Sequence, residues 1–269
     1  GTFYLPLAAD TEIFDKEISA ITQKDKARFS HDIAFVGSLY IEKNPMRTID
    51  ELPEYMTGYV NGVVEASLKV MGYNFIEETV TEELINSLKK AGLPFYNTNY
   101  SVTDTSRYLT AHSYLGAQAT EAERIRTLNT LAQYFPVDLY TLSDTSDLKN
   151  VRIRGSAKTL TEMPKIFHLS KINLNMTTKP IQTGLPLRIF DIMGCGGFCM
   201  TNFQAELPEY FEIGVDIEAY SSLEELVDKC SYYLTHESER KQIALNGYKK
   251  VKEYHTYTNR IADILRVSI

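Results

Sequence analysis

Short apolar runs alternate with amphipathic stretches along most of the chain. Residues 32–38 read Asp-Ile-Ala-Phe-Val-Gly-Ser, a continuous apolar run that ends at a Gly-Ser pair, and this pattern is typical of a strand buried on both faces. Later segments repeat a strand pattern, at 137–142, 151–155, 171–176 and 198–202. Apolar residues at helical spacing separate them, at 125–135, 163–169 and 185–193. Strands and helices that alternate in this way predict an α/β fold, a Rossmann-like doubly wound parallel sheet with right-handed crossovers.

The segment after the first strand interrupts this alternation. Between residues 44 and 118 apolar residues recur at helical spacing, first after Pro45 and again over 82–90, and Gly92 with Pro94 ends the second stretch. We therefore expect a helical insertion over about 44–118 after the first strand. The sequence assigns no role to it.

The pattern after residue 202 is helical to the end of the chain. Ser222 and Glu225 have the spacing of a capping box, and two more helices are expected near 239–254 and 259–267. The whole of 31–269 is expected to form one domain. Residues 1–30 are interpreted as the end of a preceding domain and a linker, because a lone glycine before a strand-like run indicates a fragment of a larger protein.

Composition narrows the class of protein. The 269 residues are 43% hydrophobic, enough for a core, and the net charge of -7 predicts no general attraction to nucleic acid. No stretch has the apolar length of a membrane span. The three cysteines, Cys195, Cys199 and Cys230, leave an odd thiol and have no metal-ligand spacing. We therefore expect a cytoplasmic protein whose phosphate-binding site, if it has one, is local.

Two turns of the predicted sheet offer groups to a ligand, because ligands of such sheets bind beyond the carboxyl ends of the strands. Gly37 permits close approach of the backbone to a phosphate, and Ser38 supplies a hydroxyl and an N–H. The second turn, 173–178, contains Asn173 and Asn175. A Gly-Ser pair after a strand is common in α/β domains, so a purely structural turn is the alternative interpretation at the first position.

The segment 184–191 is the most informative candidate. A helix that begins at Gly184 and Leu185 would direct free N–H groups and the positive end of its dipole at the same crevice, where a diphosphate would be stabilised. Arg188 and Asp191 are three residues apart and share one helix face, so a guanidinium can bind phosphate while a carboxylate accepts from ribose hydroxyls. The alternative is that the two side chains pair with each other on a solvated face.

Metal-binding patterns are absent from the sequence. It contains no Asp-x-Asp pair, and neither a Gly-x-Gly-x-x-Gly motif nor a Walker-type loop follows the first strand. We therefore expect no metal and a metal-free handling of phosphate.

The order of several segments resembles a known family. It is similar to the C-terminal domain of group 1 glycosyltransferases of the spore-maturation-protein type, which have the GT-B fold. The resemblance rests on these segments: 172–175, 184–198, 206–207, 211–214, and in the tail 232–234, 239–240, 243–247 and 255–257 with Arg260. The opening residues 4–14 and 32–40 are similar to the passage where those enzymes leave the N-terminal domain.

This resemblance implies a function. The domain would hold a nucleotide sugar, with the carboxylate of Asp191 on the ribose, and would transfer the sugar to an unknown acceptor, as a hexosyltransferase does. Relatives carry an acidic residue eight positions before this carboxylate, where this chain has Thr183. The acceptor-binding N-terminal domain would be missing, so the isolated fragment is expected to be inactive, and no catalytic acid or base is named.

Another class of protein fits the same pattern. A non-catalytic nucleotide- or sugar-binding module, or an interaction module, would use the same crevice to sense a ligand or dock a partner. A hydrolase or epimerase of sugar nucleotides is a further alternative, but an epimerase requires acidic and histidine residues clustered at the crevice, and no such cluster is evident.

Overall fold

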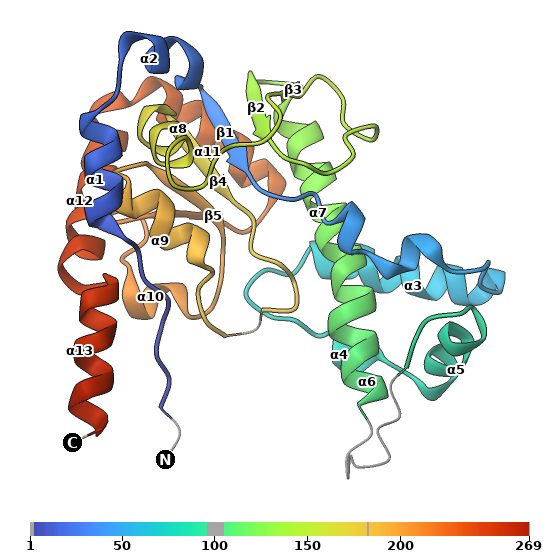
Figure 1. Cartoon of the computed structure of the whole chain (residues 1–269). Coiled ribbons are helices and arrows are strands. Elements are labelled where there is room, and N and C mark those ends of the chain that lie inside the picture. Colours follow the sequence, from blue (N-terminus) through green and yellow to red (C-terminus); the bar gives the residue numbers. More distant parts are fainter. Residues whose placement is uncertain (1–2, 96–104, 182, 269) are drawn as a thin grey trace.

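Six parallel strands form the centre of the molecule (Figure 1), in the order β3-β2-β1-β4-β5-β6. The computed structural model describes residues 3–95, 105–181 and 183–268. The strands are β1 (Ile33–Val36), β2 (Val137–Tyr140), β3 (Arg152–Ile153), β4 (Ile172–Asn175), β5 (Cys199–Asn202) and β6 (Glu218–Tyr220). Each pairs in parallel with its neighbours. The predicted α/β, Rossmann-like doubly wound sheet is therefore confirmed.

Alternate side chains of the strands enter two hydrophobic cores. In β1, Ile33 and Phe35 belong to one core and Ala34 and Val36 to the other, as the pleat of a strand requires. Helices cover both faces of the sheet: α1 (Thr11–Ser19), α2 (Gln23–Phe29), α8 (Met163–Leu169) and α9 (Leu187–Gly194) on one, α7 (Gly116–Leu131) and α11 (Leu223–Thr235) on the other. The long helix α12 (Glu237–Tyr254) contributes to both cores.

The strand β6 was not expected, because the pattern after residue 202 was interpreted as helical throughout. It has only three residues, and its first, Glu218, is a buried acid. The carboxylate of Glu218 accepts from Lys229 Nζ at 2.9 Å and from the hydroxyl of Tyr233 at 2.6 Å. Partners that come from α11 thus permit an edge strand with a charged residue, which local sequence patterns do not reveal.

A helical lobe follows β1 and has a core of its own. After two 3-10 turns, 41–43 and 45–48, it comprises α3 (Glu54–Leu68), α4 (Ile76–Thr79), α5 (Glu82–Lys90), α6 (Ser106–Tyr108) and a π-helical segment, Leu109–Leu115. Residues 96–104 of the expected insertion lie outside the described part of the chain. Because α7 contributes Ala119 to this core and Leu128 to the core of the sheet, one continuous helix connects the lobe to the sheet.

The two ends of the described chain lie side by side. Ala9 N donates to the carbonyl of His255 at 2.9 Å, and Arg260 Nε donates to the carbonyl of Pro6 at 2.7 Å. Figure 1 shows the N-terminal segment running beside α13 (Tyr257–Ser268), with the short α10 (Leu207–Tyr210) close by. None of the described helices is long and apolar enough to cross a membrane.

Close packing of α12 against the sheet domain makes Gly247 sensitive to substitution. A Cβ atom there would lie 2.4 Å from the carbonyl oxygen of Asp216 and 2.8 Å from Met193 Cε. We expect Gly247→Ala to lower the free energy of unfolding by about 1–3 kcal/mol, measured by urea denaturation. Gly62→Ala is the control, because a Cβ on this residue of α3 meets nothing within 4 Å and should stabilise the helix by about 0.5–1 kcal/mol. Equal effects of the two substitutions would contradict the packing.

His255 makes folding dependent on pH. Burial, reinforced by the nearby Arg260 and Lys250, lowers the pKa of His255 to about 4, below the usual 6.5. Because the folded protein resists protonation of this ring, the stabilisation is complete above pH 6.5 and is lost as the pH falls from 6.5 towards 4. Urea denaturation should show that the difference in unfolding free energy between the native chain and His255→Gln shrinks by about 1–3 kcal/mol over this range. A difference that stays constant with pH would exclude this role.

Candidate functional site

The carboxyl ends of β1 and β4 are adjacent, and the order of strands reverses between them. A crevice at such a reversal is where doubly wound sheets bind ligands. The turn that begins at Gly37 follows β1, and Met176 and Thr177 follow β4. These two turns define the candidate site.

Arg124 of α7 joins the two turns. Its Nη1 donates to the carbonyl of Ser38 at 2.5 Å and its Nη2 to the carbonyl of Met176 at 2.8 Å. The residue is only 8% exposed, and its guanidinium lies 4.7 Å from the ring centroid of Tyr40. Burial lowers the pKa of Arg124. Sequence reasoning missed this residue, although its position four residues before the buried Leu128 placed it on the apolar stripe of the helix.

The hydroxyl of Ser38 is engaged within its own turn. It donates to Glu42 Oε1 at 2.6 Å and accepts from Tyr40 N at 2.8 Å. The N–H of Gly37 donates to the carbonyl of Tyr140 at 3.0 Å. A phosphate at this turn would therefore compete with Glu42 for the hydroxyl. Of the two donors predicted on Ser38, the hydroxyl therefore already has a partner.

The side chains of both candidate asparagines make hydrogen bonds within the sheet domain. Asn173 is 0% exposed in the middle of β4, and its Nδ2 donates to the carbonyl of Phe167 at 2.9 Å. Asn175 is 3% exposed and donates to the hydroxyls of Thr177 and Thr201, at 3.0 and 2.9 Å. Asn173 thus connects β4 to α8, and Asn175 shapes the turn after β4. A ligand cannot reach Asn173 without displacing this packing.

The helix after β4 begins later than the sequence predicts. Pro186 has an extended backbone (φ -70°, ψ 150°), so α9 starts at Leu187 and not at Leu185. Leu185 is buried in a hydrophobic core, and the N–H of Gly184, at φ +91°, donates to the carboxylate of Glu206. Thr183 is exposed and lines a groove with Tyr4 and Glu206. The free N–H groups at the start of α9 therefore belong to residues after Pro186.

Arg188 and Asp191 pair with each other, as the alternative interpretation predicted, but in a partly buried place. Arg188 Nη1 lies 3.2 Å from Asp191 Oδ2, with side-chain exposures of 30% and 10%. Arg188 also contacts Met163 Sδ, and its guanidinium lies 5.4 Å from the ring centroid of Phe167. Burial raises the pKa of Asp191 to about 6, although Arg188 opposes the shift. Ribose hydroxyls would therefore have to share or replace the bond from Arg188.

Arg188 and Arg124 belong to the same electrostatic environment. Burial is the main cause of the lowered pKa of Arg188, as it is for Arg124. The positive charge of Arg188 also contributes to lowering the pKa of Arg124. Two arginines, one from α7 and one from α9, thus give the carboxyl-end rim a local positive charge in an acidic protein.

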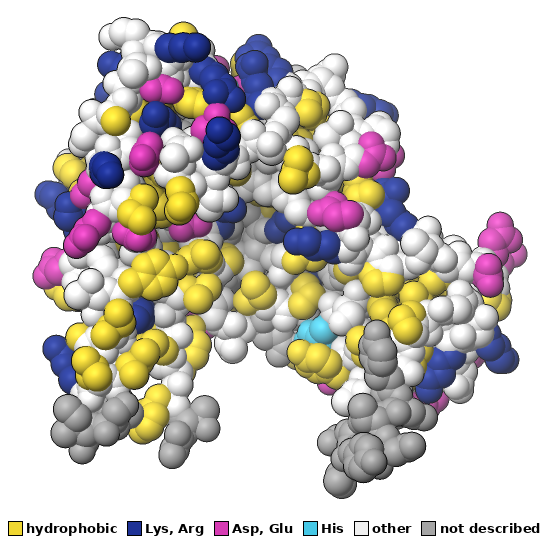
Figure 2. All heavy atoms as spheres, viewed as in Figure 1, with side chains coloured by type: hydrophobic (Ala, Val, Ile, Leu, Met, Phe, Trp, Pro, Cys, Tyr) yellow, Lys and Arg dark blue, Asp and Glu magenta, His cyan; other side chains and the backbone are white. Residues whose placement is uncertain are grey.

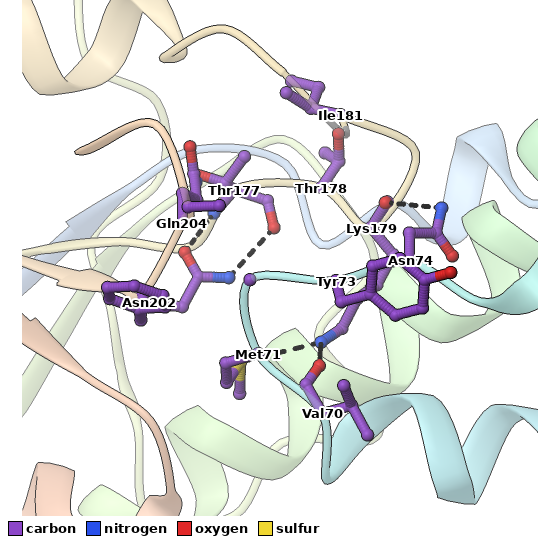
Figure 3. A pocket seen from close by; sticks show the side chains of 13 residues that line it. Val70, Met71, Tyr73, Asn74, Thr177, Thr178, Lys179, Ile181, Asn202 and Gln204 are labelled. Carbon is purple, nitrogen blue, oxygen red and sulfur yellow. Dashed lines mark hydrogen bonds between the residues drawn. The ribbon is translucent and has the colours of Figure 1, made fainter. Parts of the chain in front are cut away.

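A pocket opens on the same rim between the sheet and the helical lobe (Figure 3), and we call it the Lys179 pocket. Three segments line it: 70–74 of the lobe, 177–179 with Ile181 after β4, and 202–205 at the end of β5. The side chain of Lys179 is 8% exposed, and Nζ lies 3.6 Å from Oε1 of Glu123. Burial raises the pKa of Glu123. Sequence reasoning missed this pocket, because one of its walls comes from the lobe segment 70–74, about a hundred residues before the other two segments.

Within the described part of the chain, no three His, Cys, Asp or Glu side chains come together in a way that could hold a metal ion. All three cysteines are buried and free. The described histidines thus form no metal-binding group with these residues at the site.

Comparison of the sequence with models of known protein families shows the family of this chain. The profile of the glycosyl transferase-like family matches residues 124–266, which is more than half of the chain. The chain belongs to the glycosyl transferase-like family. No protein of curated description matches this family member.

Solved structures similar to this glycosyl transferase-like chain include three of named source. Anabaena HepE in complex with UDP is 11% identical, with a TM-score of 0.46 over 97% of this chain and 56% of that one. A mutant of Staphylococcus aureus TarM in complex with fondaparinux, alpha-GlcNAc-glycerol and UDP is 10% identical. Its TM-score is 0.43, over 70% of this chain and 42% of that one. A Rickettsia africae glycosyltransferase is 12% identical, with a TM-score of 0.42 over 81% and 67%.

The glycosyl transferase-like chain is shorter than most of these proteins. It spans 31% of the length of TarM in a further structure and 31% of a chain of the GtfA/B complex.

The bridge made by Arg124 predicts a stability difference within one helix. Arg124→Met would leave a buried carbonyl, that of Met176, and a part-buried one, that of Ser38, without their donor, so we expect a loss on the order of 2–4 kcal/mol in the free energy of unfolding. Arg126→Met is the matched control, because Arg126 pairs with Glu65 on the surface and such pairs contribute about 0–1 kcal/mol. Urea denaturation of both variants tests this. Similar losses for both would show that Arg124 does not fasten the turns.

Proposed function

We propose that this chain is the donor-binding part of a glycosyltransferase that uses a nucleoside-diphosphate sugar. The main support for this proposal is the pair of arginines at the carboxyl ends of β1 and β4: Arg124 is buried and Arg188 is half-buried. Because the chain belongs to the glycosyl transferase-like family, we interpret this local positive charge as the site for the diphosphate of the donor. Within that family we assign the chain to the spore-maturation-protein type, on the tail segments that end with Arg260.

The proposed position of the diphosphate follows from the groups on the rim. Its oxygens would accept from the backbone N–H of Ser38 and from the first N–H groups of α9, where the helix dipole favours negative charge. Arg188 would turn from Asp191 to the phosphates and bind them as a fork. The released carboxylate of Asp191 would then accept hydrogen bonds from the ribose hydroxyls.

This arrangement supplies one part of the chemistry of transfer. As the bond between the anomeric carbon and the phosphate oxygen breaks, negative charge grows on the departing diphosphate. Arg188, the start of α9 and the first turn are held in place before the reaction and stabilise that charge. We propose that this occurs without a metal ion. The acid or base that serves the acceptor is assigned to no residue of this chain.

We further propose that an acceptor-binding domain completes the enzyme and that this part alone binds donor without transferring sugar. Figure 2 shows hydrophobic side chains gathered over the N-terminal segment and α13. The exposed apolar residues there are Phe3, Tyr4, Leu5, Leu7, Tyr257, Ile261, Ile264 and Leu265. An apolar surface of this extent is typical of a protein contact. A cytoplasmic location, which suits three free cysteines, is part of the same proposal.

Donor binding should depend on pH through Asp191. The carboxylate form accepts ribose hydroxyls, and the raised pKa of about 6 means that much of this form appears only as the pH rises through 6. Uridine, guanosine and adenosine diphosphates are first screened by thermal shift, and the sugar conjugate of the one that binds is titrated by calorimetry. We expect its affinity to rise up to about tenfold between pH 5 and 7. Nucleotide sugars are suitable because each phosphorus of their diphosphate carries a single acidic oxygen, which does not titrate in this range.

The matched variants are Asp191→Asn, which should bind donor more weakly and without this pH dependence, and Asp263→Asn, which changes an exposed carboxylate on α13 and should leave both unchanged. If Asp191→Asn keeps the native affinity and pH profile, the assignment of the ribose to Asp191 is wrong. Turnover by the full-length protein then distinguishes an enzyme from a non-catalytic nucleotide- or sugar-binding module.

A further inference from the structure

The helical lobe forms a fixed wall of the Lys179 pocket. Asn74 Nδ2 donates to the carbonyl of Lys179 at 2.9 Å, which fastens the lobe to the loop after β4. Gly72 has φ +76°, and a Cβ on it would lie 2.8 Å from the ring of Phe203. The turn 70–74 therefore packs directly on the rim of the sheet and keeps the pocket in shape (Figure 3).

The cation of this pocket has no close acceptor among the described residues. Lys179 Nζ lies 3.4 Å from the carbonyl oxygen of Val70, 3.7 Å from Met71 Sδ and 3.6 Å from Glu123 Oε1. Charge-assisted hydrogen bonds are normally about 2.7–2.9 Å long. Burial raises the pKa of Glu123, and Lys179 opposes this shift from 3.6 Å. Lys179 is also the one charged residue in the wall that the described residues form.

The second observation concerns the amides in the wall. Both polar atoms of the Gln204 side chain are buried and have no hydrogen-bond partner in the described structure. The other two amides are engaged: Asn202 Oδ1 accepts from Thr177 N at 2.8 Å, and Asn74 Oδ1 accepts from Ile76 N at 3.1 Å. A buried amide without partners loses its hydration and gains no hydrogen bond in exchange, which is unfavourable. Gln204 thus provides an unused donor and acceptor in the same pocket wall as Lys179.

We propose that the Lys179 pocket binds an anionic oxygen group, a carboxylate or a phosphate, carried by a substrate. Lys179 supplies the charge, the Gln204 amide donates to an anionic oxygen, and its carbonyl accepts a hydroxyl from the same ligand. Thr177 in the wall follows Met176, whose carbonyl Arg124 binds, so the pocket adjoins the position given to the diphosphate. That the anion belongs to the transferred sugar or to the acceptor rests on the proposed function. Lys179 is then a residue that determines specificity.

The test uses the purified chain and free probes that need no nucleotide. Thermal unfolding is measured with D-glucuronate, inorganic phosphate and neutral D-glucose at matched ionic strength. We expect glucuronate or phosphate to raise the unfolding midpoint more than glucose does. The rise in unfolding midpoint caused by the anion should disappear in Lys179→Met, become smaller in Gln204→Leu and persist in Lys179→Arg. Lys241→Met, which changes a 71% exposed lysine of α12, is the control and should keep the native response.

Each outcome has one meaning. A response to glucuronate alone assigns the anion to a sugar acid, and a response to phosphate alone assigns it to a phosphorylated ligand. No response to either, or a response that Lys179→Met retains, overturns the proposal. Because Lys179→Met leaves Glu123 buried without its partner, the double variant Glu123→Gln/Lys179→Met provides the same test if the single variant does not fold.

A final comparison connects the pocket to the donor. If the anion is a sugar acid, a nucleoside-diphosphate glucuronate should bind at least about tenfold more tightly than the matching glucose conjugate, and Lys179→Met should remove the difference while the bare nucleoside diphosphate binds as before. Failure of every nucleoside diphosphate to bind would refute the proposed function and leave the result with free anions standing.

Discussion

The contact on which the site depends is the bridge from Arg124 to the carbonyls of Ser38 and Met176. Those carbonyls belong to the turns after β1 and β4, the strands between which the order of the sheet reverses. One buried guanidinium thus fixes the distance between the two loops that form the crevice. Because α7 also carries part of the core of the helical lobe, the same helix sets the position of the lobe over the rim.

Local patterns predicted the sheet because β1 is a continuous apolar run and β2 and β4 carry apolar residues at alternate positions, and each of these strands is buried on both faces. They missed β6, since Glu218 is acceptable in a strand only when Lys229 and Tyr233 reach it from α11. They also placed the start of α9 too early, because the extended Pro186 delays the helix to Leu187. These differences depend on tertiary partners or on single backbone angles, which periodicity does not contain.

The candidate site was predicted in part. The spacing of Arg188 and Asp191 gave their shared helix face, and the structure adds the burial that raises the pKa of Asp191. Asn173 has the right place in the chain, but its side chain is buried on the face of the sheet that α8 covers, where its Nδ2 donates to the carbonyl of Phe167. The Lys179 pocket was beyond sequence reasoning, since Gly72 and Phe203 meet only in the folded chain.

A crystal structure of this chain with a bound nucleoside diphosphate is the most direct test of the account. We predict the phosphates between the turn at Gly37 and the first turn of α9, with Arg188 rotated from Asp191 onto a phosphate oxygen. The nucleotide would instead contradict the account if it lay at the opposite rim, in the groove that His31, Arg152 and Lys171 help to line.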